Sequence, residues 1–416
     1  MTGETRIPGA VTIEHRLTVP LVHDGLGGDG SDETIEVFAR EIADLDGRDR
    51  PFLVFLQGGP GFEAPRPGDA SSPAWLGRAL RDYRVLMLDQ RGTGLSTPYA
   101  GPGPDAAADA ARLTHFRADA IVADAEAFRQ HLGVERWSVL GQSFGGFCAL
   151  RYLSAAPDSL REAFFTGGLP PVGRPAEEVY ATTYATMRLL DERYHRRFPG
   201  DRERLERLLG LCDEGVVLDP QGEPISRRLL RTIGNVLGKD GGAETLHYLL
   251  ELDPRSAAFR HDVLGFLPFD GRNPLYSVVH ESCYADGGTT RWAADRALPD
   301  DFAGDSLLLT GEHLYPWTFE ETPGLRPYRE VAGILAGQDW PRLYDAGVLS
   351  SIDLPCAAAV YYDDPFVDRV LSLETAELIP TMRPWITSEY LHSGLRASGE
   401  HVLDRLIALA RGRVER

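Results

Sequence analysis

A serine stands among glycines in the string GQSFGG, which occupies residues 141 to 146. The string before it, RWSVL at 136 to 140, is apolar and β-branched enough for a short buried strand. The string after it, FCALRYL at 147 to 153, repeats apolar side chains at helical spacing. A G-x-S-x-G pattern at a strand-to-helix joint forces a tight bend that leaves the serine hydroxyl exposed above the sheet. The pattern therefore predicts that Ser143 is a nucleophile, although a glycine-rich turn can also contain a serine without any function.

Strand-like and helix-like segments alternate through the first part of the chain. The apolar runs PFLVFL at 51 to 56 and RVLML at 84 to 88 are typical of parallel strands covered on both faces. Two earlier runs, 11 to 22 and 34 to 42, indicate an opening hairpin, and 118 to 132 has the apolar spacing of a helix. This alternation predicts an α/β fold, a mostly parallel sheet flanked by helices.

The alternation stops in the middle of the chain. Residues 168 to 341 are mostly helix-like with many charges, as in TMRLLDERYHRRF. Strand-like runs return at 355 to 362 and 382 to 387, and an amphipathic helix is expected from about 398 to 411. We therefore predict a sheet domain in two parts, 1–167 and 342–416, interrupted by a mainly helical cap domain, 168–341.

A serine hydroxyl becomes a good nucleophile only when a histidine accepts its proton, and the histidine needs a carboxylate that orients it. In sheets of this kind the order along the chain is serine, acid, histidine, each after the carboxyl end of a strand. Asp364 follows the run that ends at Tyr362, and His392 follows the run that ends near Thr387. We expect Ser143, Asp364 and His392 to form a catalytic triad.

Two members of this triad have alternatives. Asp363 also follows the strand, although it could equally be a solvated turn residue, and Asp368 is a third acid close by. We favour Asp364 because it precedes Pro365, where the chain should leave the sheet. The other C-terminal histidine, His401, falls inside the expected final helix, whereas the favoured histidine lies on a loop that is free to reach the serine.

Acyl transfer also needs N–H donors aimed at the developing oxyanion. One is expected from the residue after the nucleophile, the backbone N–H of Phe144. The string QGGPG at 57 to 61 supplies the second loop, in which Gly58 and Gly59 allow a close approach because they lack Cβ. Without the serine motif, a plain Gly-Pro turn would be the preferred interpretation.

The string DQRGTGLS, residues 89 to 96, belongs to the same edge of the expected sheet. Its Asp89 and Arg91 are expected to pair with each other and brace the glycine turn. We assign this string a structural role and no chemistry.

The net charge of the chain limits the kinds of partner that it can bind. It has 62 Asp and Glu against 43 Lys and Arg, and the resulting net charge of −19 repels phosphate backbones and anionic lipid. We therefore expect neither nucleic acid nor a membrane as the partner, and a neutral or mildly cationic small ligand instead. No segment approaches the ~20 apolar residues of a transmembrane helix, and the N-terminus lacks a signal-peptide pattern, so we predict a cytoplasmic protein.

The cysteines lie far apart, and none belongs to a C-x-x-C pair. This pattern favours free thiols over a zinc site or a disulfide framework, and no cofactor is indicated. The four are Cys148, Cys212, Cys283 and Cys356.

Three strings in this order, GGPG at 58 to 61, DQRGTGLS at 89 to 96 and GQSFGG at 141 to 146, closely resemble the proline iminopeptidase (prolyl aminopeptidase) family of α/β-hydrolases. The resemblance covers most of the chain and is thin from about 170 to 270. It implies an α/β-hydrolase fold, a helical cap and the triad positions Ser143, Asp364 and His392. Later strings that also resemble the larger members are VVHESCYAD at 278 to 286, LLTGEHLYPW at 308 to 317, VYYDDPFVD at 360 to 368 and LHSGLRASGEHVLDRL at 391 to 406.

The same resemblance implies substrate-binding residues. The protonated amine of a peptide would be costly to bury unpaired, so a carboxylate in the cap is its natural partner. Glu281 and Glu312 match positions where the family carries acids near the site, and of the two we favour Glu281. One departure is Gln57, which stands where many relatives have histidine before GGPG.

The expected triad predicts a serine hydrolase that works through an acyl-enzyme, and the resemblance implies that it is an aminopeptidase that removes N-terminal proline from short peptides. An esterase or amidase for small acyl substrates would use the same triad without needing cap carboxylates. A dehalogenase or epoxide hydrolase would have aspartate where this chain has Ser143, and a non-catalytic binding module usually has a broken triad. Self-association of the chain, peptide length and tolerance for other N-terminal residues stay open.

Overall fold

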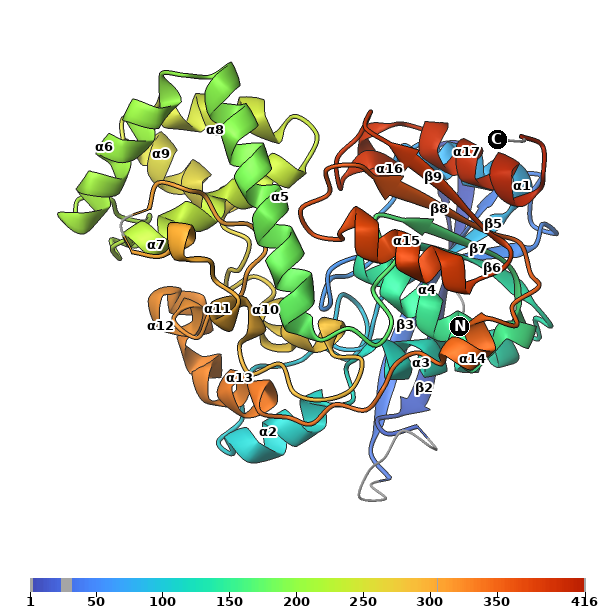
Figure 1. Ribbon diagram of the computed structural model, residues 1–416. Coiled ribbons are helices and arrows are strands. Elements are labelled where there is room, and N and C mark those ends of the chain that lie inside the picture. Colours follow the sequence, from blue (N-terminus) through green and yellow to red (C-terminus); the bar gives the residue numbers. More distant parts are fainter. Residues whose placement is uncertain (1–2, 24–31, 305, 415–416) are drawn as a thin grey trace.

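The computed structural model describes residues 3–23, 32–304 and 306–414 (Figure 1). Its strands form one nine-stranded sheet in the order β1-β2-β3-β5-β4-β6-β7-β8-β9. The strands are β1 (Glu4–Ile7), β2 (Ala10–Pro20), β3 (Thr34–Asp44), β4 (Phe52–Leu56), β5 (Arg84–Leu88), β6 (Trp137–Gln142), β7 (Leu160–Thr166), β8 (Cys356–Tyr361) and β9 (Met382–Thr387).

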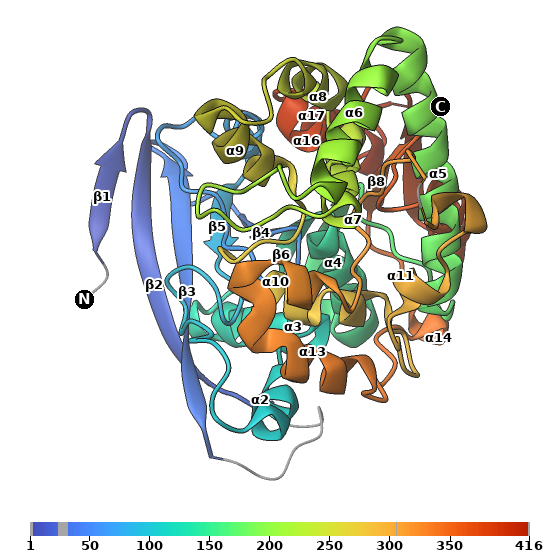
Figure 2. The same cartoon turned by 90° about the vertical axis from the view of Figure 1, so that its left-hand side faces the viewer.

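The sheet is mostly parallel, as the alternation predicted. The pairs from β5 through β9 are all parallel, while β1, β2 and β3 form an antiparallel edge that is visible in Figure 2. The predicted opening hairpin is confirmed as β2 and β3, and the short β1 was not predicted. The chain adds β5 on one side of β4 and β6 on the other, so the strand order reverses at β4. In open sheets of this type, ligands bind at the carboxyl ends of the strands beside such a reversal.

Helices cover both faces of the sheet because its central strands are apolar on both sides. Leu53 and Phe55 of β4 pack into one buried cluster with side chains of α1 and α17, whereas Val54 and Leu56 pack into the other with side chains of α3 and α4. The apolar run is thereby buried throughout β4, while Pro51 in front of the strand is exposed. The helices around the sheet are α1 (Leu76–Asp82), α3 (Ala118–His131), α4 (Phe144–Ala155), α15 (Arg369–Leu378), α16 (Gly394–Ala397) and α17 (His401–Ala410).

The segment between β7 and β8 is helical and adds no strand to the sheet in the described residues. Most of it forms a separate layer beside the sheet (Figure 1). α2 (Ala106–Leu113), from the earlier part of the chain, packs against α13 of this layer, and α14 returns to pack on α4. The helices are α5 (Ala176–Arg197), α6 (Asp201–Asp213), α7 (Arg227–Arg231), α8 (Gly242–Leu250), α9 (Ala257–Asp262), α10 (Pro274–Val279), α11 (Ala293–Arg296), α12 (Thr318–Glu321), α13 (Arg329–Ala336) and α14 (Ala346–Leu349). No helix in the described ranges has the length and hydropathy needed to cross a membrane.

The loop after β5 is braced by two ion pairs, one of which is buried on both sides. The carboxylate of Asp89 binds both Nη atoms of Arg66, at 2.8 and 2.5 Å. Arg91 binds Asp124 of α3 through Nε and Nη2, at 2.8 and 2.6 Å, and both side chains are buried. The predicted pairing of Asp89 with Arg91 is therefore wrong, because each residue faces a different segment that is distant in the sequence.

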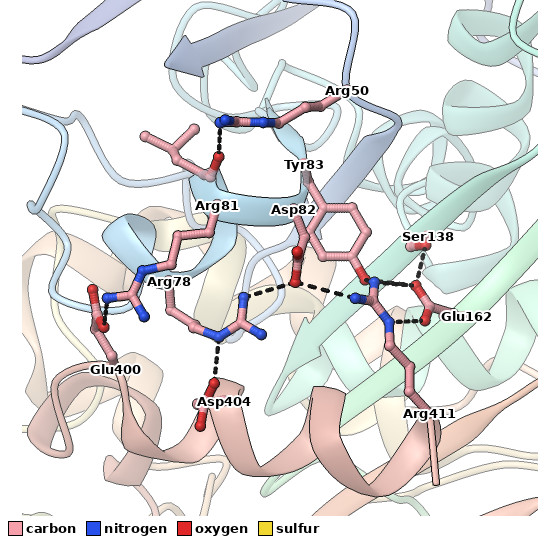
Figure 3. Close-up of polar contacts among 11 residues, drawn as sticks. Arg50, Arg78, Arg81, Asp82, Tyr83, Ser138, Glu162, Glu400, Asp404 and Arg411 are labelled. Atoms are coloured by element: carbon pink, nitrogen blue, oxygen red, sulfur yellow. Dashed lines mark hydrogen bonds and ion pairs between the residues drawn. The ribbon is translucent and has the colours of Figure 1, made fainter. Parts of the chain in front are cut away.

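A polar network fastens the C-terminal helix α17 to the rest of the domain (Figure 3). Arg78 of α1 joins Asp404 of α17 at 2.5 Å and Asp82 at 2.8 Å. Arg411, just after α17, binds Glu162 of β7 at 2.7 Å. These contacts fix the end of the chain that follows the loop bearing His392.

The Arg91–Asp124 pair offers a test of this bracing. Replacing Arg91 with alanine leaves the Asp124 carboxylate buried with only His23 beside it, at 2.7 Å. We expect Arg91→Ala to lower the free energy of unfolding by about 3 kcal/mol or more, measured by urea denaturation. The exposed pair of Arg207 with Glu203 is the matched control, and an equal effect of Arg207→Ala would contradict a bracing role for Arg91.

Candidate active site

Ser143 sits at a strained bend between β6 and α4. Its backbone has φ 54° and ψ −126°, a conformation that non-glycine residues rarely adopt. The bend needs glycine beside it, since a Cβ on Gly145 would lie 1.8 Å from the carbonyl oxygen of Leu56. The backbone N–H of Ser143 donates to the carbonyl of Thr166 in β7 at 3.1 Å. The elbow is thus held between the ends of three neighbouring strands.

The residues expected as partners of Ser143 lie within hydrogen-bond distance of one another. His392 Nε2 lies 2.9 Å from Ser143 Oγ, and His392 Nδ1 lies 2.7 Å from Asp364 Oδ2. The Asp364 side chain is fully buried, and its Oδ1 accepts the backbone N–H groups of Phe366 and Val367 at 2.9 and 3.0 Å. A carboxylate held in this way can orient the imidazole and stabilise its protonated form.

The alternatives for the acid and the base have other partners. Asp363 pairs with Arg193 of α5 at 2.5 Å, and Asp368 caps α15 by accepting the N–H of Leu371. His401 is the first residue of α17, and its Nδ1 lies 3.1 Å from the hydroxyl of Tyr390. The expected placement of His401 in a helix is confirmed.

The expected oxyanion donors lie beside the serine. Phe144 is the first residue of α4, so its N–H has no acceptor within the helix. Gly59 has φ 66°, and it lines the same hollow as Ser143 and Phe144. Gly58 approaches so closely that an added Cβ would lie 2.8 Å from Ser143 Cβ. Gln57 is buried, and its carbonyl accepts a hydrogen bond from Gln90 at 2.8 Å.

A cavity of about 290 Å³ opens above Ser143, between the sheet and the helical layer. Phe62 and Gln142 line it from the sheet side, and Tyr276 and Glu312 from the helical side. A smaller hollow shares Ser143, Gly59, Tyr276 and Glu312 with the cavity, and aromatic rings form much of its remaining wall: Phe144, Phe147 and Tyr284. The site therefore combines a serine, a carboxylate and an apolar wall.

The two glutamates expected to bind substrate are placed differently. Glu312 lines both hollows at Ser143, and its Oε1 accepts the hydroxyl of Tyr276. Glu281 lines a separate hollow with Thr290 and Trp340, and its Oε1 accepts the N–H of Ala294 at 3.1 Å. Burial raises the pKa of Glu281 to about 7. The structure thus brings Glu312, and not the favoured Glu281, to the cavity of Ser143.

Sequence analysis did not identify many of the residues that line the cavity, among them Tyr276, Lys239 and Arg396. Tyr276 and Lys239 lie outside every recognisable motif, and Arg396 lies in a matched string but had no assigned role. Among the residues in the described ranges, no three His, Cys, Asp or Glu side chains are grouped as a metal site would require.

Comparisons with known proteins agree with the geometry. Residues 51–208 match the model of the alpha/beta hydrolase fold family. The chain is 43% identical to a proline iminopeptidase of Aeromonas sobria, over 95% of this chain and 96% of that protein. It is 31% identical to the proline iminopeptidase aneH of Aspergillus aculeatus, over 97% of this chain and 94% of that protein. Likeness of this extent, over the full length of two relatives, establishes that the chain belongs to the proline iminopeptidase family of α/β-hydrolases.

Proposed function

We propose that this protein is a serine aminopeptidase that releases N-terminal proline from short peptides. The observation that carries the proposal is the chain of hydrogen bonds from Ser143 through His392 to the buried Asp364. The relatives, which bear the name proline iminopeptidase, supply the proposed substrate. The aromatic side chains of Phe144, Phe147 and Tyr284 beside the serine offer an apolar wall against which a proline ring can pack.

The proposed reaction has two halves. Ser143 Oγ attacks the proline carbonyl carbon while its proton passes to His392 Nε2, and the N–H groups of Phe144 and Gly59 stabilise the oxyanion. The C–N bond then breaks as His392 returns the proton to the leaving amine. Water attacks the resulting ester by the same route, which frees proline and restores the serine hydroxyl.

The charged amine of the substrate needs an anionic partner inside this cavity. We propose Glu312 for this role, since it lines the cavity together with Ser143 and is oriented by Tyr276. Glu281, which the sequence favoured, becomes a supporting residue behind the cavity wall. An esterase with the same triad would not need either carboxylate.

The compartment and the assembly of the protein stay predictions. All four cysteines are buried free thiols, which supports the proposed location in the reducing cytoplasm. Self-association of the chain is left open.

Ser143→Ala should leave a folded protein whose kcat on proline aryl amide is reduced by a factor of about 10⁴ or more, because no other hydroxyl replaces the nucleophile. Steady-state kinetics give the rate, and circular dichroism checks the fold. Near-normal turnover would rule out the serine mechanism.

The two C-terminal histidines should differ sharply. His392→Ala should lower kcat on the same scale as loss of the serine, because the general base is removed. His401→Ala should leave kcat almost unchanged and alter the free energy of unfolding by about 0.5 kcal/mol at most. Loss of turnover in the His401 variant alone would show that the base is wrongly assigned.

Glu312→Gln keeps the shape of the side chain and removes its charge. The kcat/KM for proline aryl amide should fall at least about a hundredfold, because the cationic amine loses its partner in a partly dry cavity. Hydrolysis of an uncharged aryl ester should stay within about threefold, since the triad is untouched. Glu281→Gln is the matched control and should cost less on proline aryl amide.

Equal losses of Glu312→Gln on the amide and the ester would assign a purely structural role to Glu312. A larger loss of kcat/KM for proline aryl amide in the Glu281 variant would show that Glu281, and not Glu312, binds the amine of the substrate.

A further inference from the structure

Two cations line the cavity of Ser143 without a salt bridge in the described part of the chain, although the carboxylate of Glu312 in the same cavity attracts one of them, Lys239. They are Lys239, which directly follows a 3₁₀-helix at Thr232–Gly238, and Arg396 of α16. Arg396 makes one long hydrogen bond, from Nη2 to Gln142 Oε1 at 3.4 Å. Arg272 lines the same cavity but is neutralised by Glu63 at 2.6 Å. Lys239 and Arg396 are therefore available to an anion from outside.

Unpaired cations in this place are unexpected for such an acidic chain. Acidic residues outnumber basic ones by 62 to 43, so a carboxylate partner could readily have been supplied. Lys239 is also the only lysine of the 416 residues, and all the other residues counted as Lys or Arg are arginine. Neighbouring side chains partly desolvate the two cations and lower the pKa of Lys239 and of Arg396, although both residues remain exposed to solvent. A bound anion would favour the charged form of both.

The backbone holds Lys239 beside the catalytic histidine. The N–H of His392 donates to the carbonyl of Gly238 at 3.0 Å. On the other side of the lysine, the N–H of Asp240 donates to Ser393 Oγ at 2.9 Å, and Asp240 Oδ1 accepts the N–H of Leu391 at 3.2 Å. Residues on both sides of Lys239 are thus bonded to the loop that carries His392.

Arg396 approaches the histidine from another direction. It lies four residues after His392 in the sequence, and Gln142, its hydrogen-bond partner, directly precedes Ser143. The two cations therefore flank the reacting groups from the helical layer and from the sheet domain.

The chemistry of the leaving group indicates which part of the substrate Lys239 and Arg396 would contact. His392 gives its proton to the departing nitrogen, so that nitrogen must lie beside the imidazole. When the leaving group is a single amino acid, its carboxylate is only two bonds from the nitrogen. When the leaving group is longer, each added residue moves the carboxylate up to ~3.5 Å further away. Only a dipeptide substrate thus brings its free carboxylate next to His392.

We propose that Lys239 and Arg396 bind the free carboxylate of the leaving amino acid, so that the preferred substrates are dipeptides with N-terminal proline. The inference rests on the proposed aminopeptidase function and names the substrate class of that site. Glu312 for the amine and two cations for the carboxylate match the two charges of a zwitterionic dipeptide. The other charged residues of the lining are engaged elsewhere, since Asp270 accepts the backbone N–H of Arg272 at 2.9 Å and Arg272 pairs with Glu63. The cavity of about 290 Å³ is at the low end of small-molecule pockets, as a dipeptide requires.

The test compares prolyl-alanine with prolyl-alanine amide, which differ only in the terminal carboxylate, and with proline aryl amide. The wild-type protein should have a kcat/KM at least about tenfold higher for the dipeptide acid than for its amide. Lys239→Gln and Arg396→Gln should each lower the value for the acid about tenfold, which is 1.4 kcal/mol, and leave both amides within about twofold. Lys239→Arg should keep the preference, and Arg272→Gln, the matched control, should not change it.

The outcomes separate this inference from the function on which it rests. No turnover of proline aryl amide by the wild-type protein would overturn the proposed function itself. Turnover of that amide with no preference for the dipeptide acid, or a preference that survives in the double Lys239→Gln, Arg396→Gln variant, would overturn the inference alone. Equal losses on all three substrates in the Lys239 variant would also overturn it, because they would show that Lys239 only supports Glu312 or His392.

Discussion

The site depends on the close approach of three backbone segments around the strained Ser143. The carbonyl of Leu56 leaves no room for a Cβ at Gly145, and the carbonyl of Gly168 leaves none at Gly146, where the atom would lie 2.2 Å away. The loops after β4, β6 and β7 are thereby packed backbone against backbone. A residue at φ 54° costs on the order of 1–3 kcal/mol, which the buried strands on either side must offset. That one bend presents the hydroxyl, directs the N–H of Phe144 and forms the floor of the cavity.

The histidine is supported from outside the sheet. Its loop is followed by α16 and α17, and α17 is fastened to α1 and β7 by the network around Arg78 and Arg411 (Figure 3). The inserted segment supplies a second support, since the carbonyl of Gly238 accepts the N–H of His392. The helical insertion therefore does more than cover the cavity, because it also helps to hold the catalytic loop.

The charged residues of the chain fall into two groups. Most ion pairs of this acidic chain bind two segments together, as Arg91 binds Asp124. In the cavity of Ser143 the arrangement differs, since Lys239 and Arg396 form no salt bridge among the described residues and remain exposed. Cations held in this way stay available to a substrate of opposite charge. This difference separates the residues that stabilise the fold from those that face the substrate.

Local patterns were enough for much of the fold. The run at 84 to 88 coincides with β5, because continuous apolar residues next to turns leave few alternatives to a buried strand. The run at 382 to 387 coincides with β9, an edge strand of mixed residues that is only partly buried. The predicted final helix from 398 begins only at His401, since a short helix and a glycine with φ 62° precede it. The short edge strand β1 was missed because its four residues carry no buried pattern.

The sequence by itself determined the elbow at Ser143 and the order of serine, acid and histidine. Both depend on local signals, the spacing of the glycines and the residues at which strands end, which a few neighbouring residues are enough to specify. It left Asp363 beside Asp364, and it ranked Glu281 above Glu312. Only the tertiary structure turned Asp363 toward Arg193, placed Glu312 at the cavity and brought Lys239 to His392. These positions depend on how the helical layer packs on the sheet, which is a sum of many long-range contacts that no short stretch of sequence contains.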